Sequence, residues 1–313
     1  MLKVFYATDL HGSEVCWRKL VNAGPFHGAD VVICGGDMTG KAMLPIVQDG
    51  SRWEVTFQDN RYTLDSEDQV REIEKKIINR GYYPVRVTRE EMKELAGDQD
   101  LVDQRFKEAM LSTVERWMDI AEQKLAGTDI RLVVCPGNDD MFEVDKVIAR
   151  SNTVEMGEAK VLDLGGFSMV SMGWTNPTPW NTYREASEDK LRGRIERMVE
   201  KAADLRRTIF NFHAPPFGSN LDDAPALDED LKPIMGGRAL RPVGSRAVRE
   251  AIGQHQPLLS LHGHIHEGKG TQRMGKTLAI NPGSAYEEGV LQGSIIELDE
   301  SRGKIKNYVL VTG

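Results

Sequence analysis

The sequence predicts an α/β protein built on one largely buried β-sheet or on two sheets packed against each other. Short apolar runs rich in β-branched residues recur along the chain, and Gly, Pro, Asn or Asp bounds each of them, which favours strands over short buried helices. Helical patterns lie between several of these runs. In chain order, the predicted strands are residues 4–7, 31–34, 132–135, 169–172, 209–212, 258–261, 278–280 and 295–298.

Two helices are predicted between the later strands, over residues 188–203 and 246–254. Gly244 precedes the second helix. Ser245 is a suitable N-cap because its hydroxyl can accept a hydrogen bond from a backbone N–H of the first turn. This alternation of strands and helices is the basis for the α/β assignment.

The segment between about residues 41 and 128 has a different pattern. Apolar residues alternate on both sides of Asp59 and Asn60, which predicts a β-hairpin. A charged helix is expected next, then a strand, then a longer helix whose apolar stripe we interpret as core packing. These three elements are predicted over residues 67–80, 82–87 and about 101–125.

We interpret the chain as a single domain over residues 1–313 that contains an insertion or cap over about residues 45–125. The final helix of the insertion could belong to the main domain. The hairpin carries Trp53, Phe57 and Tyr62, and an exposed apolar face there would favour self-association. A homo-oligomer formed through the insertion is therefore one expectation.

Charge and hydropathy exclude several classes of protein. The chain has 40 Lys and Arg against 48 Asp and Glu, a formal net charge of −8, which repels a nucleic-acid backbone unless a basic patch or a bound metal reverses the field locally. No apolar run approaches the eighteen or so residues of a membrane helix. The first residues are typical of a strand rather than of a signal peptide. We therefore expect a cytoplasmic protein with no membrane partner and disfavour nucleic acid as a partner.

Five short motifs place oxygen or imidazole ligands directly after predicted strands, at the edge where open α/β sheets bind ligands. Each alone has an ordinary explanation, because an Asp at a strand end is often a turn residue and a lone His is often packed. Four of the seven histidines fall in these motifs, however, so we interpret the set as one site. The motifs are Asp9-Leu10-His11-Gly12, Gly35-Gly36-Asp37, Gly137-Asn138-Asp139-Asp140, Asn211-Phe212-His213-Ala214-Pro215 and Gly263-His264-Ile265-His266.

In this order the motifs resemble those of the calcineurin-like metallophosphoesterase superfamily, D-x-H, G-D, G-N-H-[DE], H and G-H-x-H. The resemblance covers nearly the whole chain, up to the turn Asn281-Pro282-Gly283-Ser284. It implies a four-layer αββα sandwich of two mixed β-sheets flanked by helices, with two divalent metal ions at the sheet edge. It assigns Asp9, His11 and His266 to the first ion, Asn138, His213 and His264 to the second, and Asp37 to both.

The chemistry of these residues agrees with that assignment. Side chains two apart on an extended segment point the same way, so Asp9 with His11, and His264 with His266, can each converge on one site. Carboxylate, imidazole and amide ligands suit first-row ions, with manganese expected and iron or zinc as alternatives. Two such ions about 3.5–4 Å apart can share a hydroxide and direct it at phosphorus. We therefore expect hydrolysis of a phosphate ester.

The chain departs from the resemblance at Asp139, where the pattern has a histidine that stabilises the transition state or protonates the leaving group. We treat Asp139 and its neighbour Asp140 as catalytic candidates. An ionised Asp139 would reduce the net charge of two divalent ions, two carboxylates and a hydroxide from plus one to zero. We therefore predict that phosphodiesters, which carry one negative charge, and nucleotide-type small molecules are preferred over monoesters.

Three functions remain open from the sequence. The leading one is a metal-dependent phosphodiesterase acting on a small phosphorylated substrate. The second is an attenuated protein of the same fold that serves as an interaction scaffold; the altered Asp139 favours it, whereas the intact ligand set opposes it because buried acids and imidazoles are costly without metal. The third is a nuclease, which the net charge disfavours.

Residues that could select the substrate are less sharply defined. Trp174 and Trp180 could stack on a base, with packing as the competing interpretation. Arg238, Arg241 and Arg246 could hold a phosphate oxygen, or could simply be solvated. His262 could support the ligand histidines from behind.

Overall fold

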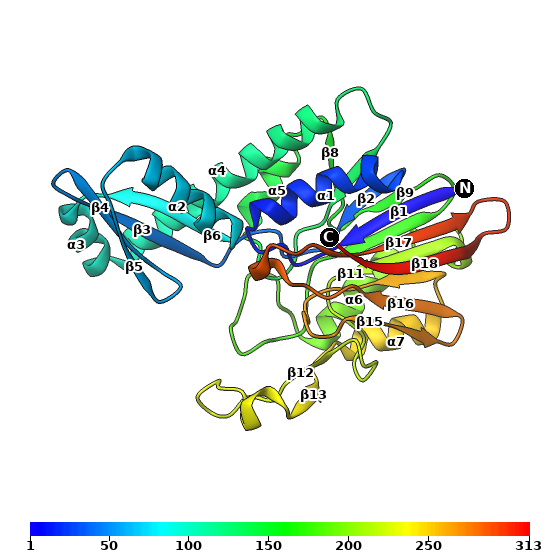
Figure 1. Cartoon of the computed structure of the whole chain (residues 1–313). Coiled ribbons are helices and arrows are strands. Elements are labelled where there is room, and N and C mark those ends of the chain that lie inside the picture. The colour runs from blue at the N-terminus through cyan, green and yellow to red at the C-terminus, as the bar shows by residue number, and fades with distance from the viewer.

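The computed structural model describes residues 1–313, and two six-stranded β-sheets form its centre (Figure 1). The first sheet contains, in spatial order, β18 (Lys304–Thr312), β17 (Gln292–Asp299), β1 (Leu2–Ala7), β2 (Val31–Cys34), β7 (Arg131–Val134) and β8 (Val154–Met156). The second contains β15 (Gly270–Met274), β16 (Thr277–Asn281), β14 (Leu259–Leu261), β11 (Thr208–Phe212), β10 (Ser168–Met172) and β9 (Val161–Asp163). The eight predicted strands are all present, with small shifts at their ends.

Both sheets are mixed. The strands β1, β2, β7 and β8 run parallel, and β17 and β18 add an antiparallel edge. In the second sheet the four central strands are parallel, while β9 and β15 are antiparallel edges. The predicted α/β class with mixed sheets is confirmed.

Alternate residues of the first sheet enter two different cores, which explains the continuous apolar runs. Val4 and Tyr6 of β1 belong to a core shared with Ile209 of β11, so this core lies between the two sheets. Phe5 and Ala7 point to the opposite face, into a core shared with helices. The helices on that face are α1 (Glu14–His27), α4 (Gln99–Leu125) and α5 (Phe142–Ile148).

The second sheet is covered on its outer face by two helices. They are α6 (Glu188–Val199) and α7 (Arg246–His255), close to the helices predicted there. Both contribute to a core with Phe210 and Phe212 of β11. Ser245 caps α7 as predicted, accepting a hydrogen bond from Val248 N. One core therefore lies between the first sheet and its helices, a second between the two sheets, and a third between the second sheet and its helices.

Residues 42–97 form a smaller sheet that projects from the main body (Figure 1). Its strands are β5 (Asn60–Leu64), β4 (Arg52–Phe57), β3 (Ala42–Asp49) and β6 (Tyr82–Val87), in spatial order, accompanied by α2 (Glu67–Asn79) and α3 (Arg89–Gly97). The predicted hairpin is β4–β5. Its Phe57 is buried in the core of this small sheet, with Trp53 and Tyr62 packed against that core. Trp53 and Tyr62 remain partly exposed, and self-association through the insertion stays a prediction.

The long helix α4 connects the projecting sheet to the main body. Its Phe106 packs against Tyr83 of β6, whereas Trp117 stacks on Trp17 of α1 with ring centroids 4.9 Å apart. The C-terminal half of α4 thus belongs to the main core, and the boundary of the insertion stays a prediction.

The remaining elements are short. A two-stranded arm, β12 (Asp223–Pro225) and β13 (Leu240–Pro242), extends from the second sheet, and three 3₁₀ turns span Leu205–Arg207, Ile234–Gly237 and Tyr286–Glu288. None of the helices combines the length and the apolar character needed to cross a bilayer.

Candidate metal centre

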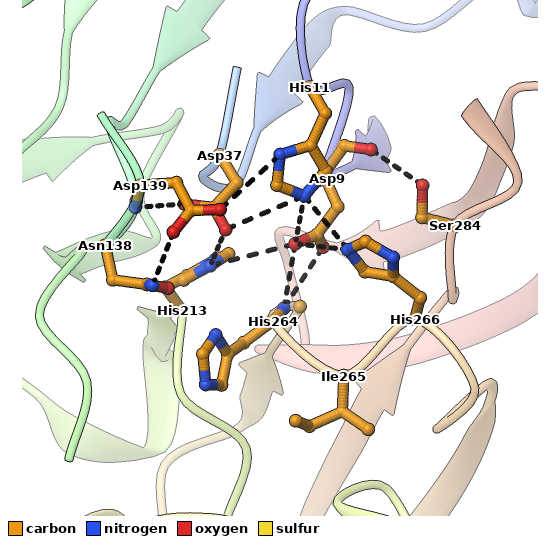
Figure 2. A network of polar contacts seen from close by, with 12 residues as sticks. Asp9, His11, Asp37, Asn138, Asp139, His213, His264, Ile265, His266 and Ser284 are labelled. Atoms are coloured by element: carbon orange, nitrogen blue, oxygen red, sulfur yellow. Dashed lines mark hydrogen bonds and ion pairs between the residues drawn. The ribbon is translucent and has the colours of Figure 1, made fainter. Parts of the chain in front are cut away.

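The seven predicted ligands lie together at the carboxyl ends of the parallel strands of both sheets (Figure 2). Asp9, Asp37 and Asn138 follow β1, β2 and β7 in the first sheet. His213 and the pair His264 and His266 follow β11 and β14 in the second. Because the two sheets face each other, these loops meet at one edge.

The loops bend sharply to direct their side chains inward. Asp9, His11, Asp37 and His264 all have positive φ angles, between 42° and 68°, which are uncommon for residues other than Gly. Backbone hydrogen bonds fix these turns, with Asp9 N donating to Gly36 O and His11 N donating to Asp37 O, each at 2.9 Å. Such strain clusters at functional sites.

Two glycines allow the ligand side chains to approach the backbone. A Cβ at Gly36 would lie 2.1 Å from Nδ1 of His213, and a Cβ at Gly263 would lie 2.4 Å from Oδ2 of Asp9. Any larger residue at these positions would displace a ligand. The glycines of the predicted motifs therefore have a direct packing role.

Three overlapping groups of ligand atoms converge, with the ligand atoms of each group all within 4.8 Å of one another. Asp9, His11 and His266 form one group, and Asp37, His213 and His264 form another. The third group combines His11 and Asp37 with Asp139. The first two groups adjoin, because His213 Nε2 is 3.2 Å from Asp37 Oδ2 and 3.8 Å from Asp9 Oδ1. This is the division into two sets that the resemblance implies.

The residues fit a bound cation. Buried atoms with no hydrogen-bond partner include His11 Nδ1, Asn138 Oδ1 and both ring nitrogens of His213. The Nε2 atoms of His11 and His266 face each other at 3.0 Å, where at most one can carry the bridging proton. Buried polar atoms are normally satisfied, so a set of unpartnered nitrogen and oxygen atoms around two buried carboxylates suits the binding of a cation.

The charges in the cluster favour a cation as well. Burial acts to raise the pKa of Asp9, but the imidazoles of His213 and His266 outweigh it and lower that pKa to about 2. Burial also opposes ionisation of Asp37, yet His213 holds its pKa well below the usual range. Conversely, the two carboxylates raise the pKa of His213 to about 9 in spite of its burial. The two ionised carboxylates therefore stabilise positive charge in the site.

The amide of Asn138 is oriented by a chain of hydrogen bonds. Its Nδ2 donates to Thr182 Oγ1 at 2.8 Å, and that hydroxyl donates to Glu185 Oε1 at 2.6 Å. The amide oxygen is thereby turned toward the cluster. Thr182 and Glu185 were not identified from the sequence, and only the chemistry of Asn138 could have suggested such partners.

Lys41 is a functional candidate that sequence reasoning missed. Its Nζ lies 2.9 Å from Oδ2 of Asp139, whose Oδ1 accepts a hydrogen bond from Asn138 Nδ2 at 3.1 Å. Burial and the Asp37 carboxylate raise the pKa of Asp139 to about 6, and Lys41 acts in the opposite direction, so the carboxyl is mostly ionised at neutral pH. Lys41 adds one positive charge that the charge count from the sequence omitted.

Asp140, predicted as catalytic beside Asp139, lies elsewhere. Its carboxylate is fully buried and accepts four hydrogen bonds. The donors are the backbone N–H groups of Met38, Thr39 and Gly137 and the hydroxyl of Thr39, at 2.6–3.1 Å. Asp140 therefore joins the loop that carries Asp37 to the loop that carries Asn138, and its geometry is that of a positioning residue.

His262 supports the site from behind, as the sequence suggested. It is fully buried, its Nε2 lies 2.8 Å from Ser260 Oγ, and its Nδ1 faces the carbonyls of Phe212 and Ala214 at 2.8 and 3.0 Å. Burial lowers its pKa to about 4, so the ring is neutral. The contacts to the residues on either side of His213 fix the backbone of that ligand.

A cleft of about 630 Å³ opens beside the cluster. Asp37, Asn138, His264 and His266 form its polar end together with Lys41 and Asp139. Apolar residues from three separate segments form its walls: α4, the loop before α6, and the β12–β13 arm. The wall residues are Phe106, Met110, Pro177, Pro179, Trp180, Tyr183, Pro225, Leu227, Pro233 and Val243.

Of the residues that the sequence suggested for substrate selection, two line the cleft and three do not. Trp180 and Arg241 line the cleft, whereas Trp174 packs under the Arg194 guanidinium, 3.8 Å from its ring centroid. Arg246 stacks on Phe217 away from the cleft, and Arg238 does not line it. The β12–β13 arm was not predicted as part of this wall.

The structure brings the ordered ligand motifs together at one edge of two packed mixed sheets, as the resemblance drawn from the sequence implies. A search of family models finds no match. The uncharacterized protein MJ1162 of Methanocaldococcus jannaschii is 27% identical over 191 residues, which cover 59% of this chain and 80% of that protein.

Solved structures agree on the fold. One crystal structure aligns with 99% of this chain and 98% of its own at a TM-score of 0.57 and 17% identity. The crystal structure of TT1561 of Thermus thermophilus aligns with 100% of this chain and 98% of its own at a TM-score of 0.51 and 14% identity. At these identities the likeness concerns the fold.

Proposed function

We propose that the protein is a metal-dependent phosphoesterase with a binuclear metal centre. The observation that carries the proposal is the pair of adjoining ligand groups at the strand ends, with orphaned imidazole and amide acceptors around Asp9 and Asp37. A buried cluster of carboxylates and imidazoles is costly unless a cation compensates its negative charge. The phosphoesterase activity is inferred from this cluster and from the resemblance of the motifs.

Asp9, His11 and His266 would hold one divalent ion, Asn138, His213 and His264 the second, and Asp37 both. The donor set of carboxylate, imidazole and amide suits manganese, with iron or zinc as alternatives. Bound in this way, the ions supply Lewis acidity toward the phosphate and a water-derived nucleophile at neutral pH.

The chain's own groups have separate tasks. Lys41 would bind a non-bridging phosphate oxygen, because its ammonium lies at the polar end of the cleft and is half exposed. Asp139 would hold Lys41 in place through their 2.9 Å contact. Asp140 and the Thr182–Glu185 pair would position Asp37 and Asn138.

We retain the predicted preference for phosphodiesters, but for a different reason than the charge of Asp139. Lys41 offsets the charge of Asp139, so charge alone no longer disfavours a monoester. What remains is that no imidazole stands at position 139 to protonate a leaving group, which favours esters whose leaving groups need little protonation. The apolar cleft walls, with Trp180 and Tyr183, suit a small phosphate ester that carries an aromatic or other apolar group, such as a nucleotide.

The test combines metal analysis with a substrate screen. Protein purified without chelator should contain about two divalent ions per chain, and manganese should support hydrolysis of bis(p-nitrophenyl) phosphate faster than that of p-nitrophenyl phosphate. Asp37→Ala is the blank. Faster monoester turnover contradicts the diester preference, and absence of both metal and turnover contradicts the phosphoesterase proposal.

The alternative of an interaction scaffold rests on the aspartate at position 139 and on the unusually long interval between Asp37 and Asn138. Metal content separates the two, because a scaffold needs no ions. We further propose a cytoplasmic location, in keeping with three free, buried cysteines, and a small phosphorylated substrate without a membrane or nucleic-acid partner.

A further inference from the structure

A second hollow, of about 610 Å³, lies apart from the metal centre. Twelve residues line it, of which six are cationic, one is acidic and two are hydrophobic. We call it the basic hollow. Its cations are Arg206, Arg207, Arg273, Lys276, Arg302 and Lys304.

The basic hollow is at the opposite end of the second sheet from the metal cluster. Arg206 and Arg207 directly precede β11, whereas His213 follows it. The five residues of β11 separate the two sites by on the order of 15–20 Å, since a strand rises about 3.3 Å per residue. Lys276 likewise precedes β16, and no residue lines both the cleft and the basic hollow.

The positive charge of the basic hollow is largely uncompensated. Arg206 lies 3.3 Å from Asp204, and Arg302 lies 3.8 Å from Asp299. The other four cations have no carboxylate within ion-pair distance: Arg207, Arg273, Lys276 and Lys304. In a chain of net charge −8, such a concentration of one sign focuses a local field that attracts anions.

The guanidinium group of Arg207 is held in place by contacts within the protein. Arg207 donates from Nε to the carbonyl of Gly166 at 2.9 Å and from Nη2 to that of Glu300 at 2.7 Å, and it lies over the ring of Phe167. A Cβ at Gly303 would lie 2.8 Å from Nη1 of Arg207, so the backbone closes directly against this side chain. Arg273 donates to the carbonyl of Lys276 at 3.3 Å. Cations fixed in advance lose less entropy when they bind an anion.

We infer that the basic hollow binds a small polyphosphorylated anion. Arginine and lysine are the side chains that recognise phosphate, and four unpaired cations match a ligand with three or more negative charges. The lining contains no aromatic residue on which a base could stack, so recognition is directed at the phosphates. A hollow of this volume suits a small molecule, whereas a nucleic-acid strand would need an extended basic stripe. The inference is independent of the proposed phosphoesterase activity.

The test is titration of the full chain, as purified, with inorganic triphosphate in an isothermal calorimeter at low salt and without added metal. We expect saturable binding of one triphosphate with a dissociation constant in the micromolar range, weakened roughly tenfold or more between 50 and 200 mM salt. The double variant Lys276→Glu/Lys304→Glu should bind on the order of 10- to 100-fold more weakly. Circular dichroism checks that it is folded.

Matched controls locate the site. The double variant Lys93→Glu/Lys124→Glu makes the same charge change at exposed lysines of α3 and α4 and should bind as the parent does. Lys41→Met and Asp37→Ala should also retain triphosphate binding. The inference is overturned if triphosphate does not saturate, if Lys41→Met or Asp37→Ala abolishes binding, or if a single-stranded RNA oligomer binds more tightly than triphosphate.

Discussion

The substitution Asp140→Asn separates a positioning role from a catalytic one. It preserves the size of the side chain and removes one acceptor oxygen and the charge. In the native site Oδ1 accepts from both Thr39 N and Thr39 Oγ1, and Oδ2 accepts from Met38 N and Gly137 N. An asparagine retains one oxygen, so its NH₂ group must face one of these two pairs of donors.

The cost follows from the donors left unpaired. If the NH₂ group faces Met38 and Gly137, two buried N–H groups lose their acceptor, at about 1–3 kcal/mol each. If it faces Thr39, the hydroxyl can rotate to accept, and one N–H stays unpaired. The side chain adopts the cheaper orientation, with one N–H unpaired, and relief of the repulsion between Asp140 and Asp37 offsets part of that cost, so we expect a loss of about 1–2 kcal/mol of unfolding free energy.

Thermal unfolding measures this loss. An unfolding entropy of about 2.1 cal/mol/K per residue gives about 0.66 kcal/mol/K for this chain, so the melting temperature should fall by about 2–3 °C. The control is Asp139→Asn, which weakens the contact with the half-exposed Lys41 and the 3.8 Å contact with His11 Nδ1 but relieves repulsion from Asp37, so it should change stability by less than about 1 kcal/mol. If Asp140→Asn abolishes hydrolysis while its melting temperature stays within about 1 °C of the parent's, Asp140 is catalytic and our interpretation is refuted.

Three further predictions address the site and the core. Chelation should lower the melting temperature by about 8 °C relative to protein with both metal sites at a hundred times their dissociation constants, and Asp37→Ala should greatly reduce this metal dependence. Lys41→Met should reduce kcat/KM on the order of 10- to 100-fold, and an equal effect of Lys93→Met would contradict the phosphate-binding role. Burial raises the pKa of Glu158 from 4.5 to about 7, so its stabilising, protonated form is complete below pH 4.5 and is lost as the pH rises through 7. Between pH 5 and pH 8, the unfolding free energy of Glu158→Gln should therefore fall by about 1–3 kcal/mol less than that of the parent. An equal fall in variant and parent would be evidence against this account.

The central strands and the ligand motifs could be predicted because their signals are local. A buried strand such as β2 shows as a continuous apolar run, and the ligands follow such runs within a few residues. The strand β3 was missed because Pro45 interrupts it. On one side the proline interrupts no pairing, because β4 pairs with β3 only from Val47 to Asp49; on the other side Pro45 lies in register with Val85 of β6.

The partners of the ligands could not be predicted, because they depend on contacts between distant segments. Nothing in the residues around Lys41 indicates that its ammonium meets Asp139. In the same way, Asp140 follows Asp139 directly and carries the same chemistry, yet its side chain accepts hydrogen bonds from the backbone of Met38 and Thr39. Sequence spacing identified the cluster, and only the packing of the loops distinguishes the carboxylates that face the cleft from those that do not.

The unbroken helix α4 sets how the projecting sheet can move. Twenty-seven residues at about 1.5 Å each make a rod of about 40 Å, clamped near its far end by the Trp17–Trp117 stack and by the hydrogen bond from Trp17 Nε1 to the Trp117 carbonyl. Phe106 and Met110, nearer its start, form part of the cleft wall. A swing of the projecting sheet must therefore bend this rod or rotate it, and either motion changes the width of the entrance through which a substrate passes.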